Sequence, residues 1–196
     1  MFKLSFLKSS FVSVCLMLLA GCAHPISINP TKTPERPQTN LKQKKVAYVL
    51  SDADRNIQVT TPGGGGDKVS YYAYRDSEKA IRDALRAVYQ DVVVISSAND
   101  LEAIKNNAIE LIYLPVLTTT SSSDSAFTWP PTFFRVELSC NVTDSKGTLI
   151  KMLKVEGNGY AEFSEFKTNL GLAGSRATSD LSEKLKKEIL NNPALF

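Results

Sequence analysis

Histidine and cysteine are scarce in this 196-residue chain, which has one histidine, His24, and three cysteines. Because no histidine follows residue 24, the Ser/His/Asp and Cys/His arrangements of nucleophilic catalysis cannot be assembled in the rest of the chain. The cysteine and histidine spacings typical of metal sites are missing as well. The sequence therefore predicts a protein that is not an enzyme and that holds neither metal nor cofactor.

Carboxylates are the one remaining route to chemistry. Two pairs stand close together in the sequence, Asp52 with Asp54 and Glu162 with Glu165. Two carboxyl groups that flank a glycosidic bond can hydrolyse it, but sequence spacing does not place them across a cleft. A carboxylate-dependent glycan hydrolase is therefore the least favoured alternative.

A strong excess of positive charge is also missing. The formal charge is +3, with 23 Lys and Arg against 20 Asp and Glu. It falls to +1 if residues 1–21 are removed, because Lys3 and Lys8 leave with no acidic residue. Binding to nucleic acid needs a basic surface, so no nucleic-acid partner is expected.

Long hydrophobic runs are absent too. The apolar run from Phe11 to Ala20 is shorter than the ~20 residues that span a bilayer. Lys3 and Lys8 precede this run, and the small residues Ala20 and Gly21 follow it. A charged start, a short apolar core and small residues at its end predict an export signal over residues 1–21.

The sequence Leu19-Ala20-Gly21-Cys22 resembles the lipobox of bacterial lipoproteins. The resemblance implies cleavage before Cys22, a diacylglyceryl thioether on its sulfur and an acyl group on its amino terminus. Ala23, where an aspartate would imply retention at the inner membrane, implies a lipid anchor in the outer membrane with the domain facing the periplasm. The alternative is an ordinary cleaved signal followed by an incidental cysteine.

The third cysteine, Cys140, then has no intramolecular disulfide partner, because Cys15 is removed and Cys22 is lipid-modified. It lies on the apolar face of an alternating segment, so we expect a small buried hydrophobic residue.

Residues 22–45 are expected to form the lipidated N-terminus and a tether. Four prolines break any helix here, at positions 25, 30, 34 and 37. Such composition favours extended, unpacked chain, which at about 3.1 Å per residue would hold the domain several tens of Å from the membrane. His24 falls in this segment and is expected to be mobile.

Residues 46–196 are expected to form one α/β domain. Buried strands are predicted at 46–50, 92–95 and 109–117, and helices at 76–88, 99–107 and 172–191. Strict alternation from Phe133 to Thr143, a turn at 144–147 and a return strand to Phe163 predict an antiparallel hairpin. Gly157 and Gly159 are expected to mark a bulge or bend. The prediction is a mixed sheet with this C-terminal hairpin, helices packed on the sheet and a closing C-terminal helix.

In element order alone, Val46 to Asn191 resembles YajG-like proteins and the periplasmic domains of CsgG-, PelC- and LpoB-like envelope lipoproteins. This resemblance implies a protein that works by binding in an envelope assembly, and it leaves a homo-oligomer open.

Two loops are candidates for binding. Gly63, Gly64, Gly65 and Gly66 predict a flexible loop that does not match a phosphate-binding motif. The segment from Thr118 to Phe133 carries Trp129, the only tryptophan, followed by two prolines. The candidate partner-binding residues are Phe127, Trp129, Phe133, Tyr72 and Tyr74. Trp129 could equally cover one end of the core or, with Phe127, enter a membrane interface.

The favoured function is a lipid-anchored accessory protein that binds an envelope protein in secretion, polymer export, flagellar or wall machinery. The alternative is a lipoprotein that binds glycan or a small ligand in a cleft lined by Tyr71, Tyr72, Tyr74 and Trp129.

Overall fold

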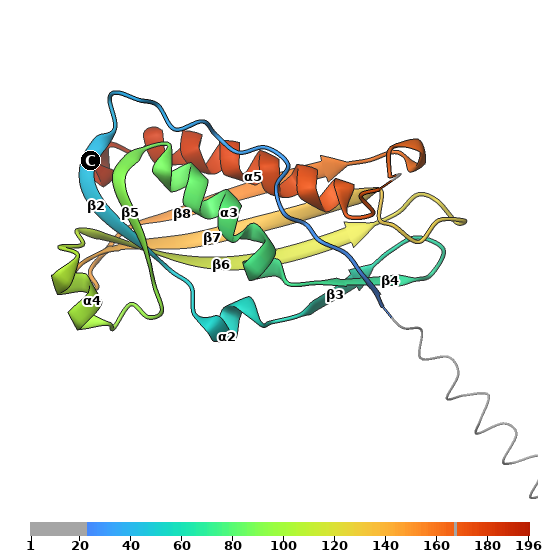
Figure 1. Ribbon diagram of the computed structural model, residues 1–196, viewed down its shortest axis with the longest axis horizontal. Helices are drawn as coiled ribbons and strands as arrows, with labels where there is room; N and C mark the ends of the chain where they lie inside the picture. The colour runs from blue at the N-terminus through green and yellow to red at the C-terminus, as the bar shows by residue number, and fades with distance from the viewer. Residues whose placement is uncertain (1–22, 167) are drawn as a thin grey trace, which may run out of the picture.

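The computed structural model describes residues 23–166 and 168–196 (Figure 1). The predicted signal segment and Cys22 lie outside these residues. The strands are β1 (His24–Pro25), β2 (Lys42–Val49), β3 (Val59–Pro62), β4 (Lys68–Tyr71), β5 (Tyr89–Ile95), β6 (Leu111–Ser122), β7 (Phe133–Asp144) and β8 (Leu149–Tyr160). The helices are α2 (Asp52–Arg55), α3 (Ala73–Arg86), α4 (Leu101–Asn106) and α5 (Leu172–Leu190), with 3-10 turns at Phe163–Glu165 and Pro193–Leu195.

A five-stranded sheet in the order β5-β2-β6-β7-β8 forms the centre of the molecule. The first two pairings are parallel, and β6, β7 and β8 form an antiparallel meander. On β7, Phe134, Val136, Leu138, Cys140 and Val142 are all buried. The mixed α/β fold and the C-terminal hairpin are thus confirmed.

The two faces of this sheet are covered unequally. Helices α3 and α5 pack on one face and enclose the main core with it (Figure 1). A smaller cluster on the other face joins α4 to one end of the sheet through Ala47, Ile95, Ile104, Ile109 and Ile112. Beyond this cluster the outer face of β6–β8 carries exposed side chains, among them Val116, Arg135 and Met152.

The N-terminal segment is part of the domain, which corrects the expectation of an unpacked tether. Strand β1 pairs with β4, and Ile28 is fully buried in the main core. The Ile28 amide donates to Asp76 (3.1 Å), and Thr178 donates to the Ile28 carbonyl oxygen (2.6 Å). The segment therefore binds α3 and α5 before the chain enters β2 at Lys42, four residues earlier than expected.

Several element boundaries also differ from expectation. Helix α3 begins at Ala73 rather than near Asp76, and the polar stretch after β2 is the short helix α2. Strand β5 is an edge of the sheet rather than a buried strand, and Leu101 points to solvent while Ile104 is buried. The Thr/Ser stretch after residue 117 extends β6 to Ser122 instead of forming a loop, so that the loop covers only residues 123–132.

Gly157 and Gly159 are not at a bulge, because both continue the regular pairing of β8 with β7. The two glycines are instead required by the packing of α5 on β8. A Cβ atom on Gly157 would overlap the carbonyl oxygen of Ala177, and one on Gly159 would overlap that of Ala173. The missing side chains let α5 lie directly on β8, with the predicted stripe from Ala173 to Ile189 buried as expected.

The outer edge of β8 is partly covered by side chains of α5. Asp180 accepts from the Asn158 amide (2.9 Å), Lys184 donates to the Glu156 carbonyl (3.0 Å), and Arg176 donates to the Tyr160 carbonyl (2.7 Å). An exposed edge strand is a template for pairing with another chain, so these contacts protect half of β8 from such pairing. Among the described residues, no helix is both long enough and apolar enough to cross a bilayer.

Candidate functional site

The chain enters the domain at one end of the molecule, which we call the entry end. It comprises residues 23–25, the β3–β4 loop (63–67), the β6–β7 loop (123–132) and residues 161–166 and 168–171 before α5 (Figure 1). Trp129 packs partly on the core, and His24 stacks on its indole ring with 4.3 Å between ring centroids. His24 also lies 3.7 Å from Asp67. His24 is therefore held in place rather than mobile.

The glycine loop supports the Trp129 loop. The Gly64 amide donates to the Trp129 carbonyl (2.9 Å), and the Gly65 amide donates to the Ser125 carbonyl (3.2 Å). A Cβ on Gly64 would overlap the carbonyl oxygen of Thr128. The glycines thus allow two backbones to approach closely, a role that the sequence interpretation as a free flexible loop missed.

The β6–β7 loop and the segments next to it present aromatic side chains to solvent. Phe127 is 97% exposed, while Phe133 is half-exposed and lies against Tyr160 with 4.8 Å between ring centroids. Phe163, on the neighbouring turn before α5, is 67% exposed. The structure therefore brings three of the predicted site residues, Phe127, Trp129 and Phe133, to the entry end, and it adds Tyr160 and Phe163.

Tyr72 and Tyr74 do not join this group. Tyr72 carries the Arg75 guanidinium over its ring at 3.7 Å, and the Tyr74 hydroxyl accepts from the Leu117 amide (3.2 Å). Tyr71 is buried and donates to Thr119 (2.6 Å). The tyrosines and Trp129 thus have separate neighbours and do not line one aromatic cleft, so the geometry does not favour the glycan-binding alternative.

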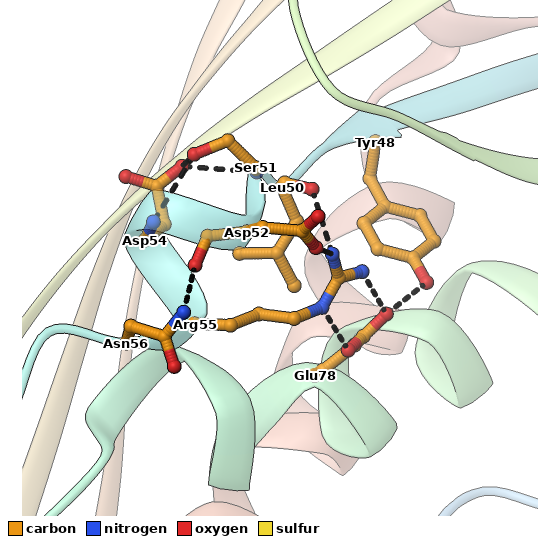
Figure 2. Close-up of polar contacts among 8 residues, drawn as sticks. All are labelled: Tyr48, Leu50, Ser51, Asp52, Asp54, Arg55, Asn56 and Glu78. Atoms are coloured by element: carbon orange, nitrogen blue, oxygen red, sulfur yellow. Dashed lines mark hydrogen bonds and ion pairs between the residues drawn. The ribbon is translucent and has the colours of Figure 1, made fainter.

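A polar cluster lies at the C-terminal end of β2, between this strand and helices α2 and α3 (Figure 2). Arg55 of α2 donates twice to Glu78 of α3, at 3.0 and 2.9 Å, and Tyr48 donates to the same carboxylate at 3.0 Å. Arg55 also donates to the Leu50 carbonyl (3.2 Å) and to Asp52 (3.0 Å). The hydrogen bonds from Arg55 hold the pKa of Glu78 below its usual range. Burial beside Glu78 raises the pKa of Tyr48. The cluster fixes α2 and α3 to the end of β2.

We expect Glu78→Gln to destabilise the protein by about 2 kcal/mol at pH 7, because charged hydrogen bonds from Arg55 and Tyr48 are weakened in a partly buried site. A carboxyl whose pKa is lowered on folding stabilises the protein above its unfolded pKa, and this contribution is lost as the pH falls through the folded pKa. Urea unfolding at a series of pH values should therefore show the gap between the two proteins closing below about pH 4.5. A gap that stays constant down to pH 3 would contradict this assignment.

The four carboxylates considered for hydrolysis have structural partners. Asp54 forms a capping box with Ser51, and Asp52 pairs with Arg55. Glu165 accepts two hydrogen bonds from Arg176, at 2.9 and 2.7 Å, which lower the pKa of Glu165 to about 2. Glu162 and Glu165 cap the turn between β8 and α5. These contacts account for both pairs without a substrate.

Cys140 lies in the main core, as the alternating pattern predicted. Burial raises the pKa of its thiol to about 12. The thiolate is the reactive form of cysteine, so this thiol is inert at neutral pH.

The uncovered half of the outer sheet face holds a second group of residues. Glu137 of β7 stands directly opposite Glu156 of β8, and Thr118 of β6 is opposite Glu137 on the other side. Arg135 lies near both carboxylates, at 3.9 Å from Glu137 and 3.5 Å from Glu156. A shallow hollow of about 350 Å³ opens between these strands, with Val116, Ser139 and Lys154 in its lining. Sequence alternation showed a wet face here, but not which residues meet across strands.

Comparison with known proteins gives fold-level likeness only. No family model and no curated protein sequence matches the chain. Among solved structures, the chain is similar to a DUF330 protein from Xanthomonas campestris, with 10% identity, a TM-score of 0.42, and coverage of 85% of this chain and 91% of that one. It is also similar to the PelC dodecamer from Paraburkholderia phytofirmans, with 17% identity, a TM-score of 0.43, and coverage of 80% and 93%. These values are too low to assign a family, a function or an assembly state.

Proposed function

We propose that the protein is a lipid-anchored accessory protein of the outer membrane that acts by binding a protein partner on its periplasmic side. Two features support the proposal. The sequence Leu19-Ala20-Gly21-Cys22 resembles the lipobox of bacterial lipoproteins, and the folded domain begins directly after it. The partner surface in this proposal is the uncovered outer face of β6, β7 and β8.

The observation that carries the binding proposal is the cross-strand pair Glu137–Glu156. Like charges directly opposite on antiparallel strands are destabilising. Arg135 lies 3.9 Å from Glu137 and 3.5 Å from Glu156, so its single positive charge balances only one of the two carboxylates. Both carboxylates are exposed on the part of this face that no helix of the described residues covers. A partner that presents lysine or arginine would relieve this repulsion, so we infer a basic surface on the partner.

Photo-crosslinking in cells tests this surface. A photoreactive amino acid at Thr118 should give one adduct of defined mass, whereas the same amino acid at Glu183, on the solvent side of α5, should give none. Changing Glu137 and Glu156 together to glutamine should reduce the Thr118 adduct by about tenfold, since both charged contacts are lost. Equal capture from Glu183, or capture that is insensitive to the double change, would contradict the proposal. An adduct of twice the protein's own mass would identify a second copy as the occupant instead.

The anchor is tested separately with Cys22→Ser. We expect this change to abolish labelling by a fatty-acid probe and to release the protein from the membrane fraction, because the lipid attaches to the cysteine sulfur. Cys140→Ser is the matched control and should stay labelled. Unchanged labelling of the Cys22→Ser protein would rule out the anchor.

A further inference from the structure

Most of the exposed aromatic side chains among the described residues lie at or next to the entry end. Phe127 (97% exposed) and Phe163 (67% exposed) come from neighbouring connections, which are joined by the Ala161 amide donating to the Thr132 carbonyl (2.9 Å). Leu170 is exposed just before α5, and Trp129, in the same loop as Phe127, is partly exposed. Large aromatic side chains presented to water in one region mark an interaction surface.

The first residues that the structure describes, from Ala23 onward, lie at the same end. His24 stacks on Trp129, and the chain then runs past Gly171, where a Cβ would overlap the Ser27 carbonyl oxygen. Two residues of extended chain span at most about 7 Å, so a lipid on the Cys22 sulfur would begin beside His24 and Trp129. The tether expected from the prolines does not intervene, because those prolines lie in a segment that packs on the domain.

The charge of the described residues at this end is not that of an electrostatic membrane site. Lys68 is exposed near it, but so are Asp67, Asp124 and Glu162. Attraction to anionic headgroups needs a basic cluster, whereas aromatic rings sit at the headgroup level of neutral lipid as well. The surface therefore fits the interface of a bilayer through its aromatic groups.

We propose that the entry end rests in the lipid interface, with Phe127, Trp129 and Phe163 in contact with the headgroup and upper acyl region. This inference rests on the lipid anchor proposed above. It holds the domain directly against the membrane, and it points α4, at the other end of the sheet in Figure 1, away from the bilayer. The outer face of β6–β8 is then free to meet a partner beside the membrane.

Trp129 is a native probe because it is the only tryptophan. The mature lipidated protein is incorporated into vesicles of phosphatidylethanolamine and phosphatidylglycerol, with and without bromine on the acyl chains. We expect quenching of the Trp129 emission by the brominated lipid, unchanged at high salt. Phe127→Ser should reduce the ratio of docked to undocked protein by about tenfold, since a largely exposed aromatic ring loses its apolar contact.

Leu101→Ser is the matched control, because Leu101 is 73% exposed but lies on α4 at the opposite end. It should leave the quenching unchanged. A protein that is labelled by fatty acid and held in the vesicles, but whose Trp129 is not quenched, would overturn this inference and leave the anchor standing. A protein that never carries lipid would overturn both. Quenching that Leu101→Ser reduces as strongly as Phe127→Ser would show that no particular end faces the lipid.

Discussion

Replacing Ile28 by alanine is expected to destabilise the domain by about 3 kcal/mol, although this residue lies in a segment whose composition predicts a tether. Ile28 is fully buried, and its side chain occupies the space that Gly174 leaves open on α5. Removing three of its carbons leaves a cavity between the N-terminal segment and α5. In a domain of this size the midpoint of thermal unfolding should fall by about 6–12 °C.

Ile57→Ala is the matched control for this experiment. Ile57 is the same residue type but 46% exposed, so its truncation should change the free energy of unfolding by no more than about 0.5 kcal/mol. Chemical denaturation of both mature proteins measures the difference. If Ile28→Ala destabilised the protein no more than Ile57→Ala, the N-terminal segment would not be an integral part of the fold. A position of the lipid anchor close to the domain would then lose its support.

Replacing Gly159 by alanine is expected to cost about 3 kcal/mol, because the added methyl group would overlap the backbone carbonyl of Ala173. A side chain could rotate away from such a contact, but a helix backbone cannot. Helix α5 would have to move off β8 and open the buried contacts of Leu181 and Leu185. Gly157→Ala should behave in the same way, since its new methyl group would overlap Ala177.

Gly147→Ala is a control that separates the steric effect at Gly157 and Gly159 from the general cost of replacing a glycine. Gly147 lies in the β7–β8 turn at a φ of +85°, with no atom within 4 Å of a built Cβ. Its replacement should cost about 1 kcal/mol through backbone strain alone. Equilibrium unfolding of the three variants gives the comparison. A cost at Gly159 no larger than at Gly147 would mean that α5 adjusts freely, and the explanation of these glycines by close packing would be wrong.

Both predictions concern contacts that set the shape of the entry end. Gly159 lies near the end of β8, and Ile28 follows the segment that stacks His24 on Trp129. If either contact loosens, Trp129 and His24 should lose their fixed relation. The stability variants can therefore also be examined for Trp129 quenching in vesicles, where weaker quenching would link the packing of α5 to membrane docking.

Local sequence patterns predicted much of the fold. The alternation from Phe133 to Thr143 predicted β7 and its buried face, and the four-residue repeat from Ala173 to Ile189 predicted the buried stripe of α5. Patterns of this kind are readable because each side chain's direction follows from its own strand or helix. The local pattern misled at Gly157 and Gly159, because a glycine within a strand can indicate either a bulge or close contact with a helix.

The prediction of an unpacked N-terminal tether was wrong for a related reason. Four prolines indicate a segment without regular secondary structure, but they do not indicate whether that segment packs on the rest of the domain. Ile28 is held by Asp76 and Thr178, which lie 48 and 150 residues further along. No window of the sequence contains such partners together. The aromatic loop was recognised by its composition, whereas its support by the glycine loop depended on two connections meeting in space.

The sequence by itself determined the antiparallel hairpin, the buried faces of β7 and α5 and the lack of histidine-based catalytic sets, and it predicted lipid attachment from the lipobox-like stretch. Each of these depends on composition, on adjacent residues or on a short repeat. Only the tertiary structure decided that the N-terminal segment packs on α3 and α5, that the glycines admit neighbouring backbones, and that Glu137 meets Glu156. Those contacts join residues that are distant along the chain, and their energy exists only once the sheet has brought them together.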